Sequence, residues 1–159
     1  MIESIHVIGG HLVQTIGGSP TAALIAIVTP GQDLPLHGGV GRLLRLQFDT
    51  LQAELEAASL RVAAFLAELH ASAARRHVYV CESEGLSRSV TIARWAARRY
   101  DIASHAALVA DAVPSCFLMV RLLASAVDDP AAALARRPAA AASAQPGARQ
   151  AALALGDAP

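Results

Sequence analysis

The sequence predicts an α/β fold with a central, mainly parallel sheet of about four strands flanked by helices, in which one strand is followed directly by a loop and a helix. Two observations carry this prediction. Short apolar runs rich in β-branched residues alternate along the chain with segments of helical periodicity. One of these runs leads through a glycine-containing turn directly into a helical segment, which is typical of layered α/β domains. The length of 159 residues suits a single domain.

Three strands are expected in the first third of the chain. Residues 5–8 form a short β-branched run that Gly9 and Gly10 end. Residues 22–28 (AALIAIV) form a second run, which Thr29-Pro30-Gly31 stops. Residues 43–48 (LLRLQF) form a third extended run. We therefore expect three strands before the first long helix.

A long helix and the strongest local signal follow. Asp49 or Thr50 is a good N-cap for a helix that we expect to end near Arg75-Arg76. Its apolar residues recur at spacings of three and four: Leu51, Leu55, Ala58, Val62, Leu66 and Leu69. Residues 77–81 (HVYVC) then read as a strand, residues 82–88 as a turn, and residues 89–100 as a second helix.

The rest of the chain divides into two helices and a tail. Helices are expected at about residues 104–112 and 116–127, separated by Pro114. From Asp128 onwards the composition is dominated by Ala, Pro, Arg and Gly, with too few large side chains to build a core. The predicted organisation is a domain over residues 1–128 and a flexible or partly helical tail over residues 129–159.

Composition argues against several classes of function. Thirteen basic and thirteen acidic residues give no net charge to attract nucleic acid or an anionic membrane. The mean hydropathy of +0.42 comes largely from alanine, and each apolar run is broken before the ~20 residues of a membrane span. The two cysteines and six histidines show no metal-ligand spacing, so we expect no metal and no cofactor. No secretory signal is visible, and we expect a cytoplasmic protein.

The turn at residues 82–88 is the best candidate for chemistry. A strand that delivers a short loop onto a helix N-terminus directs several backbone N–H groups at one point, and such a point binds anions. Gly85 permits a positive φ, Ser87 supplies a hydroxyl, and Arg88 carries a guanidinium that binds phosphate bidentately. A capped turn with a surface arginine has the same sequence, so both interpretations stay open at this point.

The segment VYVCESEGLSRSVTIARW resembles the phosphate-binding signature of the cysteine-dependent protein tyrosine and dual-specificity phosphatases. Three further segments resemble, in their order and spacing, segments of small bacterial phosphatase-like proteins: LIAIVTPGQ, LLRLQFD and AVPSCFLMVRLL. The resemblance covers about residues 4–127. In that family a cysteine thiolate attacks phosphorus, the loop amides and an arginine hold the phosphoryl oxygens, and an aspartate protonates the leaving oxygen. The resemblance implies a hydrolase of this kind acting on a phosphorylated protein or a small phosphomonoester.

Carried onto this chain, the resemblance implies Arg88 as the phosphate-binding arginine and Asp49 as the general acid. Asp49 follows the LLRLQF run as the acidic loop does in the family, although we favour its other interpretation, a helix N-cap. The phosphate loop would consist of Glu82, Ser83, Glu84, Gly85, Leu86, Ser87, Arg88 and Ser89.

The position of the nucleophile departs from the family pattern. Six positions before Arg88 stands Glu82, while Cys81 occupies the place of the family's histidine. Without a gap, Glu82 replaces the nucleophile and the site lacks thiol chemistry. With a one-residue insertion, Cys81 is the nucleophile of a longer loop. We favour the ungapped alignment, because an insertion displaces amides that must converge on one phosphate, and ~1 Å of misplacement can cost about a hundredfold in rate.

The Glu82 carboxylate is expected to occupy the loop. A cysteine sulfur is bonded directly to Cβ, whereas two further carbons carry the glutamate oxygens out to where phosphate oxygens normally lie. We therefore expect Glu82 to pair with Arg88 and the loop amides as an internal anion. Attack on phosphorus by Glu82 itself is the less favoured chemistry, because its carboxylate reaches too far. The resemblance, with Glu82 at the position of the nucleophile, thus implies a catalytically impaired pseudophosphatase with a binding or regulatory role and a protein as a candidate partner. The alternative is an active phosphatase using Cys81 in a loop longer by one residue.

Overall fold

The sheet of this computed structural model is parallel throughout, which confirms the predicted α/β class. The structure describes residues 1–16, 18–32, 39–47, 52–104 and 116–128. Four long strands and one strand of two residues pair in the order β3-β2-β4-β1-β5. Their bounds are Ile2–Gly9 for β1, Ala22–Val28 for β2, Arg42–Gln47 for β3, Arg76–Glu82 for β4 and Ala103–Ser104 for β5.

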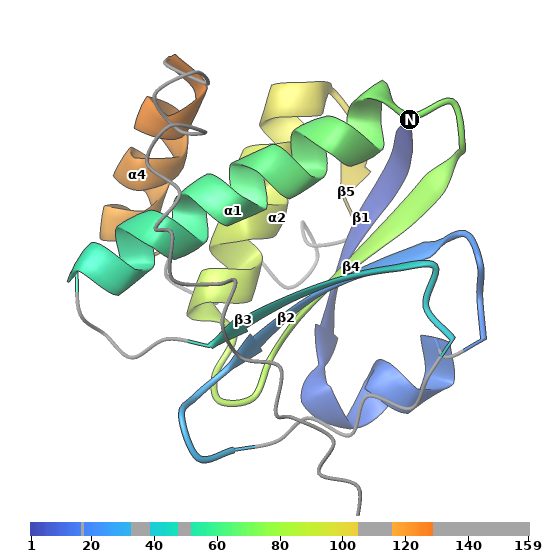
Figure 1. Ribbon diagram of the computed structural model, residues 1–159, viewed down its shortest axis with the longest axis horizontal. Coiled ribbons are helices and arrows are strands. Elements are labelled where there is room, and N and C mark those ends of the chain that lie inside the picture. Colours follow the sequence, from blue (N-terminus) through green and yellow to red (C-terminus); the bar gives the residue numbers. More distant parts are fainter. Residues whose placement is uncertain (17, 33–38, 48–51, 105–115, 129–159) are drawn as a thin grey trace, which may run out of the picture.

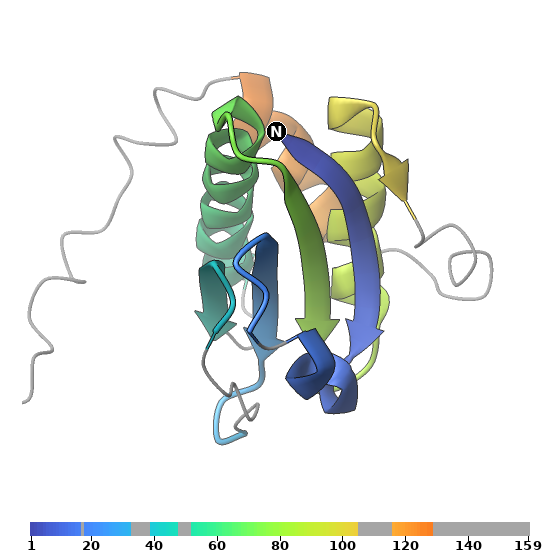
Figure 2. The ribbon, with the colours of Figure 1, turned by 90° about the vertical axis from the view of Figure 1, so that its right-hand side faces the viewer.

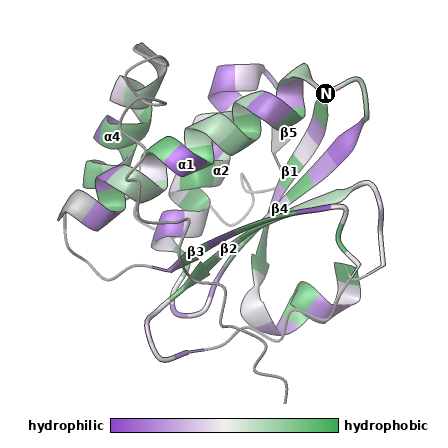
Figure 3. Cartoon of the chain, viewed as in Figure 1, coloured by the Kyte–Doolittle hydropathy of each residue, from purple (hydrophilic) through white to green (hydrophobic). Residues whose placement is uncertain are grey.

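The α-helices gather on one side of this sheet (Figures 1 and 2). They are α1 (Gln52–Ala71), α2 (Ser87–Tyr100) and α4 (Phe117–Asp128), and a 3₁₀ helix, η1 (Gly10–Ile16), follows β1. Figure 3 shows hydrophobic and hydrophilic residues mixed along α1 and α2, as expected of helices that cover one face of a sheet. Within the described ranges, no helix combines the length and apolar character that a bilayer crossing requires.

Two apolar clusters flank the sheet. The larger one lies between the sheet and the helices and includes Ile25, Val80 and Leu66, each fully buried. The smaller one, on the other face, consists of Val13, Leu24, Ala26, Val28 and Cys81. Every residue of β2 is buried, which explains its uninterrupted apolar sequence, since a strand covered on both faces needs no alternation.

Strand β4 is central, and its end defines one edge of the molecule. It pairs with β2 on one side and β1 on the other, so that Glu82 lies opposite Ile27 and Gly9. Because all strands are parallel, the carboxyl ends of β1, β2 and β4 meet at this edge. Helix α2 begins there, only a few residues after β4 ends.

Several element bounds differ from the sequence-based expectation. Strand β1 begins at Ile2 rather than residue 5, because Ile2 and Ser4 pair with the first residues of β4. Helix α1 ends at Ala71, before Arg75, because the chain must turn back to begin β4 at Arg76. Helix α2 starts two residues before the expected position 89.

One element was not predicted, and one predicted helix needs correction. Residues 10–16 form η1, a 3₁₀ helix that begins at the second of two successive glycines and shows no clear periodicity in its sequence. The helix expected over residues 104–112 does not begin at Ser104, because Ala103 and Ser104 pair with β1 as strand β5. The remainder of that segment, residues 105–112, and the tail over residues 129–159 lie outside the described residues.

A polar network lies across the first halves of β1 and β4. The Ser4 hydroxyl is 2.7 Å from His6 Nε2 and 2.8 Å from His77 Nδ1. The other ring nitrogen of His77, Nε2, is 3.5 Å from a carboxylate oxygen of Glu3. The His6 ring also stacks on Tyr79, with the ring centroids 5.1 Å apart. Side-chain contacts as well as the backbone ladder therefore join the two strands.

Candidate anion-binding loop between β4 and α2

The loop between β4 and α2 positions the candidate site. Gly85 has a φ of +75°, a conformation that glycine adopts at little cost, which confirms the turn role expected from the sequence. Leu86 holds the N-cap position of α2, with φ −143° and ψ −2°, and its own side chain makes no capping hydrogen bond. The first amides of α2 therefore need another acceptor.

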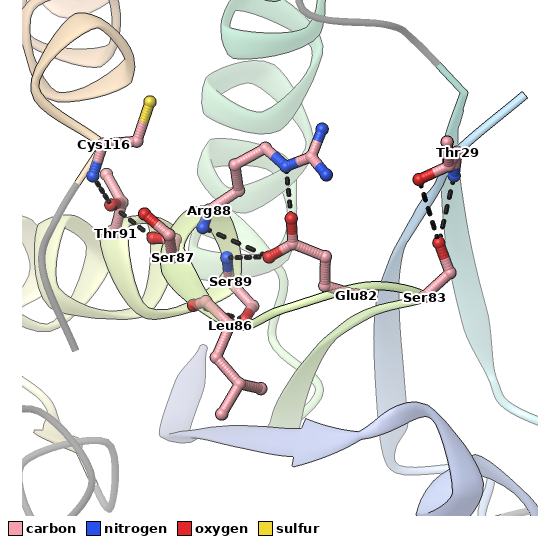
Figure 4. A network of polar contacts seen from close by, with 9 residues as sticks. All are labelled: Thr29, Glu82, Ser83, Leu86, Ser87, Arg88, Ser89, Thr91 and Cys116. Atoms are coloured by element: carbon pink, nitrogen blue, oxygen red, sulfur yellow. Dashed lines mark hydrogen bonds and ion pairs between the residues drawn. The ribbon is translucent and has the colours of Figure 1, made fainter. Parts of the chain in front are cut away.

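Glu82 supplies that acceptor from the end of the preceding strand. Its Oε2 accepts hydrogen bonds from the backbone N–H groups of Arg88 (3.2 Å) and Ser89 (3.3 Å). Its Oε1 accepts from the Arg88 Nε–H, which also makes the pair a salt bridge. Figure 4 shows the carboxylate directed at the first turn of α2 from the strand side. The expected pairing of Glu82 with Arg88 and loop amides is confirmed.

Burial makes this pair electrostatically strong. The Glu82 side chain is 3% exposed and that of Arg88 is 20% exposed. Charged hydrogen bonds of this kind are roughly twice as strong as neutral ones, and a carboxylate at a helix N-terminus also meets the favourable end of the helix dipole. Glu82 thus does the work of an N-cap residue, although it lies outside the helix and six positions before Arg88.

A second set of contacts fixes the start of the loop against β2. The Ser83 N–H donates to the Ile27 carbonyl at 2.9 Å, which extends the sheet pairing by one bond. The Ser83 hydroxyl accepts from the Thr29 N–H at 3.1 Å and lies 3.3 Å from the Thr29 hydroxyl (Figure 4). Gln32 donates a side-chain hydrogen bond to Glu84. The segment after β2 therefore supports the loop after β4.

The first turn of α2 is also tied to the start of α4. The Ser89 hydroxyl donates to the Leu86 carbonyl at 2.9 Å. The Thr91 hydroxyl donates to the Ser87 carbonyl at 2.7 Å and accepts from the Cys116 N–H at 2.8 Å. The helix end that faces Glu82 is thus held both by its own hydroxyls and by a neighbouring segment.

Cys81 points away from this site. It is fully buried in the smaller apolar cluster, beside Val13 and Val28, on the sheet face opposite the helices. Consecutive side chains of a strand point to opposite faces, so Cys81 and Glu82 cannot both face α2. Burial, together with the negative charge of Glu82, raises the pKa of the Cys81 thiol to about 11, against the opposing effect of a backbone hydrogen bond from Ile27. An activated nucleophile needs the reverse shift.

The structure therefore brings together some of the residues singled out in the sequence and separates others. Glu82, Arg88 and Ser89 meet, Cys81 lies apart from them, and Asp49 falls outside the described residues. The supporting roles of Thr29 and Thr91 were not predicted. For Thr29 a signal was available, because it directly follows β2 and the carboxyl ends of parallel strands lie side by side, which brings it near Ser83.

Comparisons with known proteins identify no family. No family model matches the chain, and neither a curated protein nor a solved structure gives a match. The resemblance to the phosphatases therefore remains a hypothesis that rests on the residues of the loop.

Proposed function

We propose that this chain is a phosphatase-like pseudophosphatase, with Glu82 in place of the nucleophilic cysteine and a binding or regulatory role. One observation carries the proposal: the Glu82 carboxylate accepts from the Arg88 guanidinium and from the backbone N–H groups of Arg88 and Ser89. These are the kinds of donor that hold phosphoryl oxygens in the family that the loop resembles. In this chain the Glu82 carboxylate, an internal anion, takes the position that the phosphoryl group of a substrate would occupy.

This arrangement opposes phosphate transfer for a chemical reason. Both Glu82 oxygens already accept hydrogen bonds from groups that a bound phosphoryl group needs. A phosphate dianion would have to displace a buried carboxylate of the same charge sign, which costs the Glu82–Arg88 pairing and adds repulsion. The geometry supports a domain whose anion-binding loop is closed to phosphate, and the role that we propose for it is binding or regulation, with a protein as the candidate partner.

Replacing Glu82 by glycine tests whether the carboxylate occupies an anion site. In Glu82→Gly the amides and Arg88 become available, so sulfate, phosphate or tungstate should bind the folded state and raise its Tm. At ten times Kd the added stability is about 1.4 kcal/mol, or roughly 3–8 °C in Tm. Wild type should respond by less than about 1 °C. A thermal-shift titration at constant ionic strength measures both proteins.

Glu84→Gln provides the matched control, because it removes one negative charge from the same loop while leaving Glu82 in place. It should respond to anions as wild type does. Equal stabilisation of wild type and Glu82→Gly would show that Glu82 does not occupy the site, and the proposal would be dropped.

A second test addresses catalysis directly. We expect the wild-type chain to hydrolyse an aryl phosphate such as para-nitrophenyl phosphate no faster than a buffer blank, because no thiol lies six positions before Arg88. In this assay the rate of hydrolysis by Cys81→Ser should be the same as that of wild type. Turnover by wild type that disappears in Cys81→Ser would instead establish an active phosphatase.

A further inference from the structure

A cluster of polar side chains on the first halves of β1 and β4 carries chemistry that the Glu82 site does not use. It consists of Glu3, Ser4, His6 and His77. Ser4 lies opposite His77 in the pairing of the two strands, and His6 lies two residues further along β1. The side chains of His77 and Glu3 are 43% and 31% exposed, so the cluster is open to solvent and to small ions.

Two imidazole nitrogens of this cluster converge on one point. His6 Nε2 and His77 Nδ1 lie 2.7 Å and 2.8 Å from the same atom, the Ser4 hydroxyl oxygen. The two ring centroids are 6.5 Å apart. With each nitrogen directed at the oxygen, this separation corresponds to an angle at the oxygen that is close to tetrahedral. Histidine nitrogens surround Zn²⁺ in such a tetrahedral arrangement.

The other nitrogen of His77 faces a carboxylate, as it does in most metal-binding histidines. Its Nε2 is 3.5 Å from Glu3 Oε2. The register of β1 against β4 shifts between Ile2 and Ser4, and such a shift redirects a side chain. Arg75 binds the other Glu3 oxygen at 2.9 Å, so Oε2 is left to face His77. The carboxylate favours a hydrogen on Nε2, which leaves the lone pair of Nδ1 for a ligand.

The two rings need little movement to coordinate a metal ion. His6 stacks on Tyr79 with the ring centroids 5.1 Å apart, which restricts the orientation of its ring. A Zn–N bond is about 2.0–2.1 Å long, so each nitrogen would have to approach the point of convergence by roughly 0.7 Å. Small side-chain rotations provide a change of this size. The cluster is therefore largely preorganised for an ion at this point.

The ligand set indicates the class of ion and an open coordination sphere. Imidazole suits Zn²⁺ and Cu²⁺, whereas Mg²⁺ and Ca²⁺ prefer oxygen ligands. Among the residues that the structure describes, no three His, Cys, Asp or Glu side chains gather as a closed metal site would require. Water would therefore complete the coordination. Arg75 opposes a cation, but its side chain is 76% exposed and its charge is paired with that of Glu3.

We propose that His6 Nε2 and His77 Nδ1 bind a divalent transition metal ion, Zn²⁺, with the Ser4 hydroxyl and water as the remaining ligands. Histidine spacing along the chain does not indicate this site, because the pairing of β1 with β4 brings together two residues that are far apart in the sequence. The proposal is independent of the function proposed for the Glu82 loop.

Titration of the full chain with Zn²⁺, in competition with a chromophoric chelator near neutral pH, tests the proposal. Wild type should bind Zn²⁺ saturably, and millimolar Mg²⁺ should not compete. His6→Gln and His77→Gln should each bind at least about tenfold more weakly, because each loses one of two imidazole ligands. His11→Gln is the matched control, because His11 is an exposed histidine of η1 outside the cluster, and it should bind as wild type does. Long-range ¹H–¹⁵N spectra should identify His6 Nε2 and His77 Nδ1 as the bound nitrogens.

Ser4→Cys gives an answer even if the histidine variants fail to fold. A thiolate at the point of convergence adds a third strong ligand, so Zn²⁺ should bind at least about a hundredfold more tightly than to wild type, a gain that loss of folding cannot produce. Adding His77→Gln to Ser4→Cys should remove most of this gain. The proposal would be overturned by equal Zn²⁺ affinity of wild type and His6→Gln, by bound nitrogens other than these two, or by no gain in Ser4→Cys.

Discussion

Two neighbouring side chains at the end of β4 have opposite surroundings. Cys81 lies among apolar residues on one face of the sheet, while Glu82 reaches the first turn of α2 on the other. A shift of one residue along a strand exchanges the two faces. The choice between the two alignments of the phosphatase-like motif is therefore a choice of which side chain meets Arg88, and this strand presents Glu82.

The buried thiol makes Cys81 unreactive in the folded chain. With its pKa raised to about 11 from the usual 9.0, the thiolate fraction at pH 8 falls about a hundredfold, and burial restricts access as well. In a Cys116→Ser background, so that Cys81 is the only thiol, labelling by a disulfide reagent at pH 8 should be at least a hundredfold slower in buffer than in denaturant. Comparable rates would mean that Cys81 is accessible.

The same raised pKa of Cys81 makes the free energy of unfolding decrease as the pH becomes alkaline. Below pH 9 the thiol is neutral in both states and contributes no pH dependence. As the pH rises from 9 towards 11, the unfolded chain ionises Cys81 while the folded chain does not, so stability decreases, by on the order of 2 kcal/mol in all. Denaturant unfolding of wild type and Cys81→Ser should show the wild type losing more stability over this range. Parallel pH profiles would contradict the shift.

At the scale of elements, α2 is stabilised at its two ends by different means. Its first amides bind the Glu82 carboxylate. Its last turn ends at Asp101, which adopts the left-handed conformation with φ 50° and ψ 51°. The N–H groups of Asp101 and Ile102 both donate to the Ala97 carbonyl, the latter at 3.1 Å. Glycine is the residue usually found at such a helix end.

Replacing Asp101 by glycine should therefore stabilise the chain. A left-handed conformation costs a residue with a Cβ about 1–2 kcal/mol, somewhat less for aspartate, and glycine loses part of this gain through its greater freedom when unfolded. We expect Asp101→Gly to raise the free energy of unfolding by about 0.5–1 kcal/mol in urea denaturation. Asp101→Ala should lower it. A destabilised glycine variant would show that the aspartate side chain contributes more than its backbone strain costs.

At the scale of the whole molecule, periodicity was enough to predict the fold class and the four long strands. The β4–loop–α2 unit was also predictable, because its residues signal a strand, a glycine turn and a helix in direct succession. Other features depend on pairing between distant segments. Strand β1 includes Glu3 and Ser4, whose polar side chains carry no strand signal, and β5 exists because residues 103–104 lie beside β1. Local sequence does not contain that information.

Removing residues 129–159 should leave the domain folded. Their composition offers little large apolar area to bury, so truncation after Asp128 should cost less than ~1 kcal/mol. Denaturant unfolding of the full chain and of residues 1–128 measures the difference. A large fall in Tm, or loss of cooperative unfolding, would show that the tail packs against the domain.

The network of Ser4, His6 and His77 links the proton positions of two strands. If His77 is neutral and directs its Nε2–H at Glu3, its Nδ1 accepts the Ser4 proton, and the Ser4 oxygen must then accept an N–H from His6. If the proton of His77 is on Nδ1 instead, this N–H donates to Ser4 and the hydroxyl turns to donate to His6 Nε2. The single hydroxyl proton of Ser4 thus couples the tautomer of His6 to that of His77, and the side-chain hydrogen bonds of this network reverse direction together.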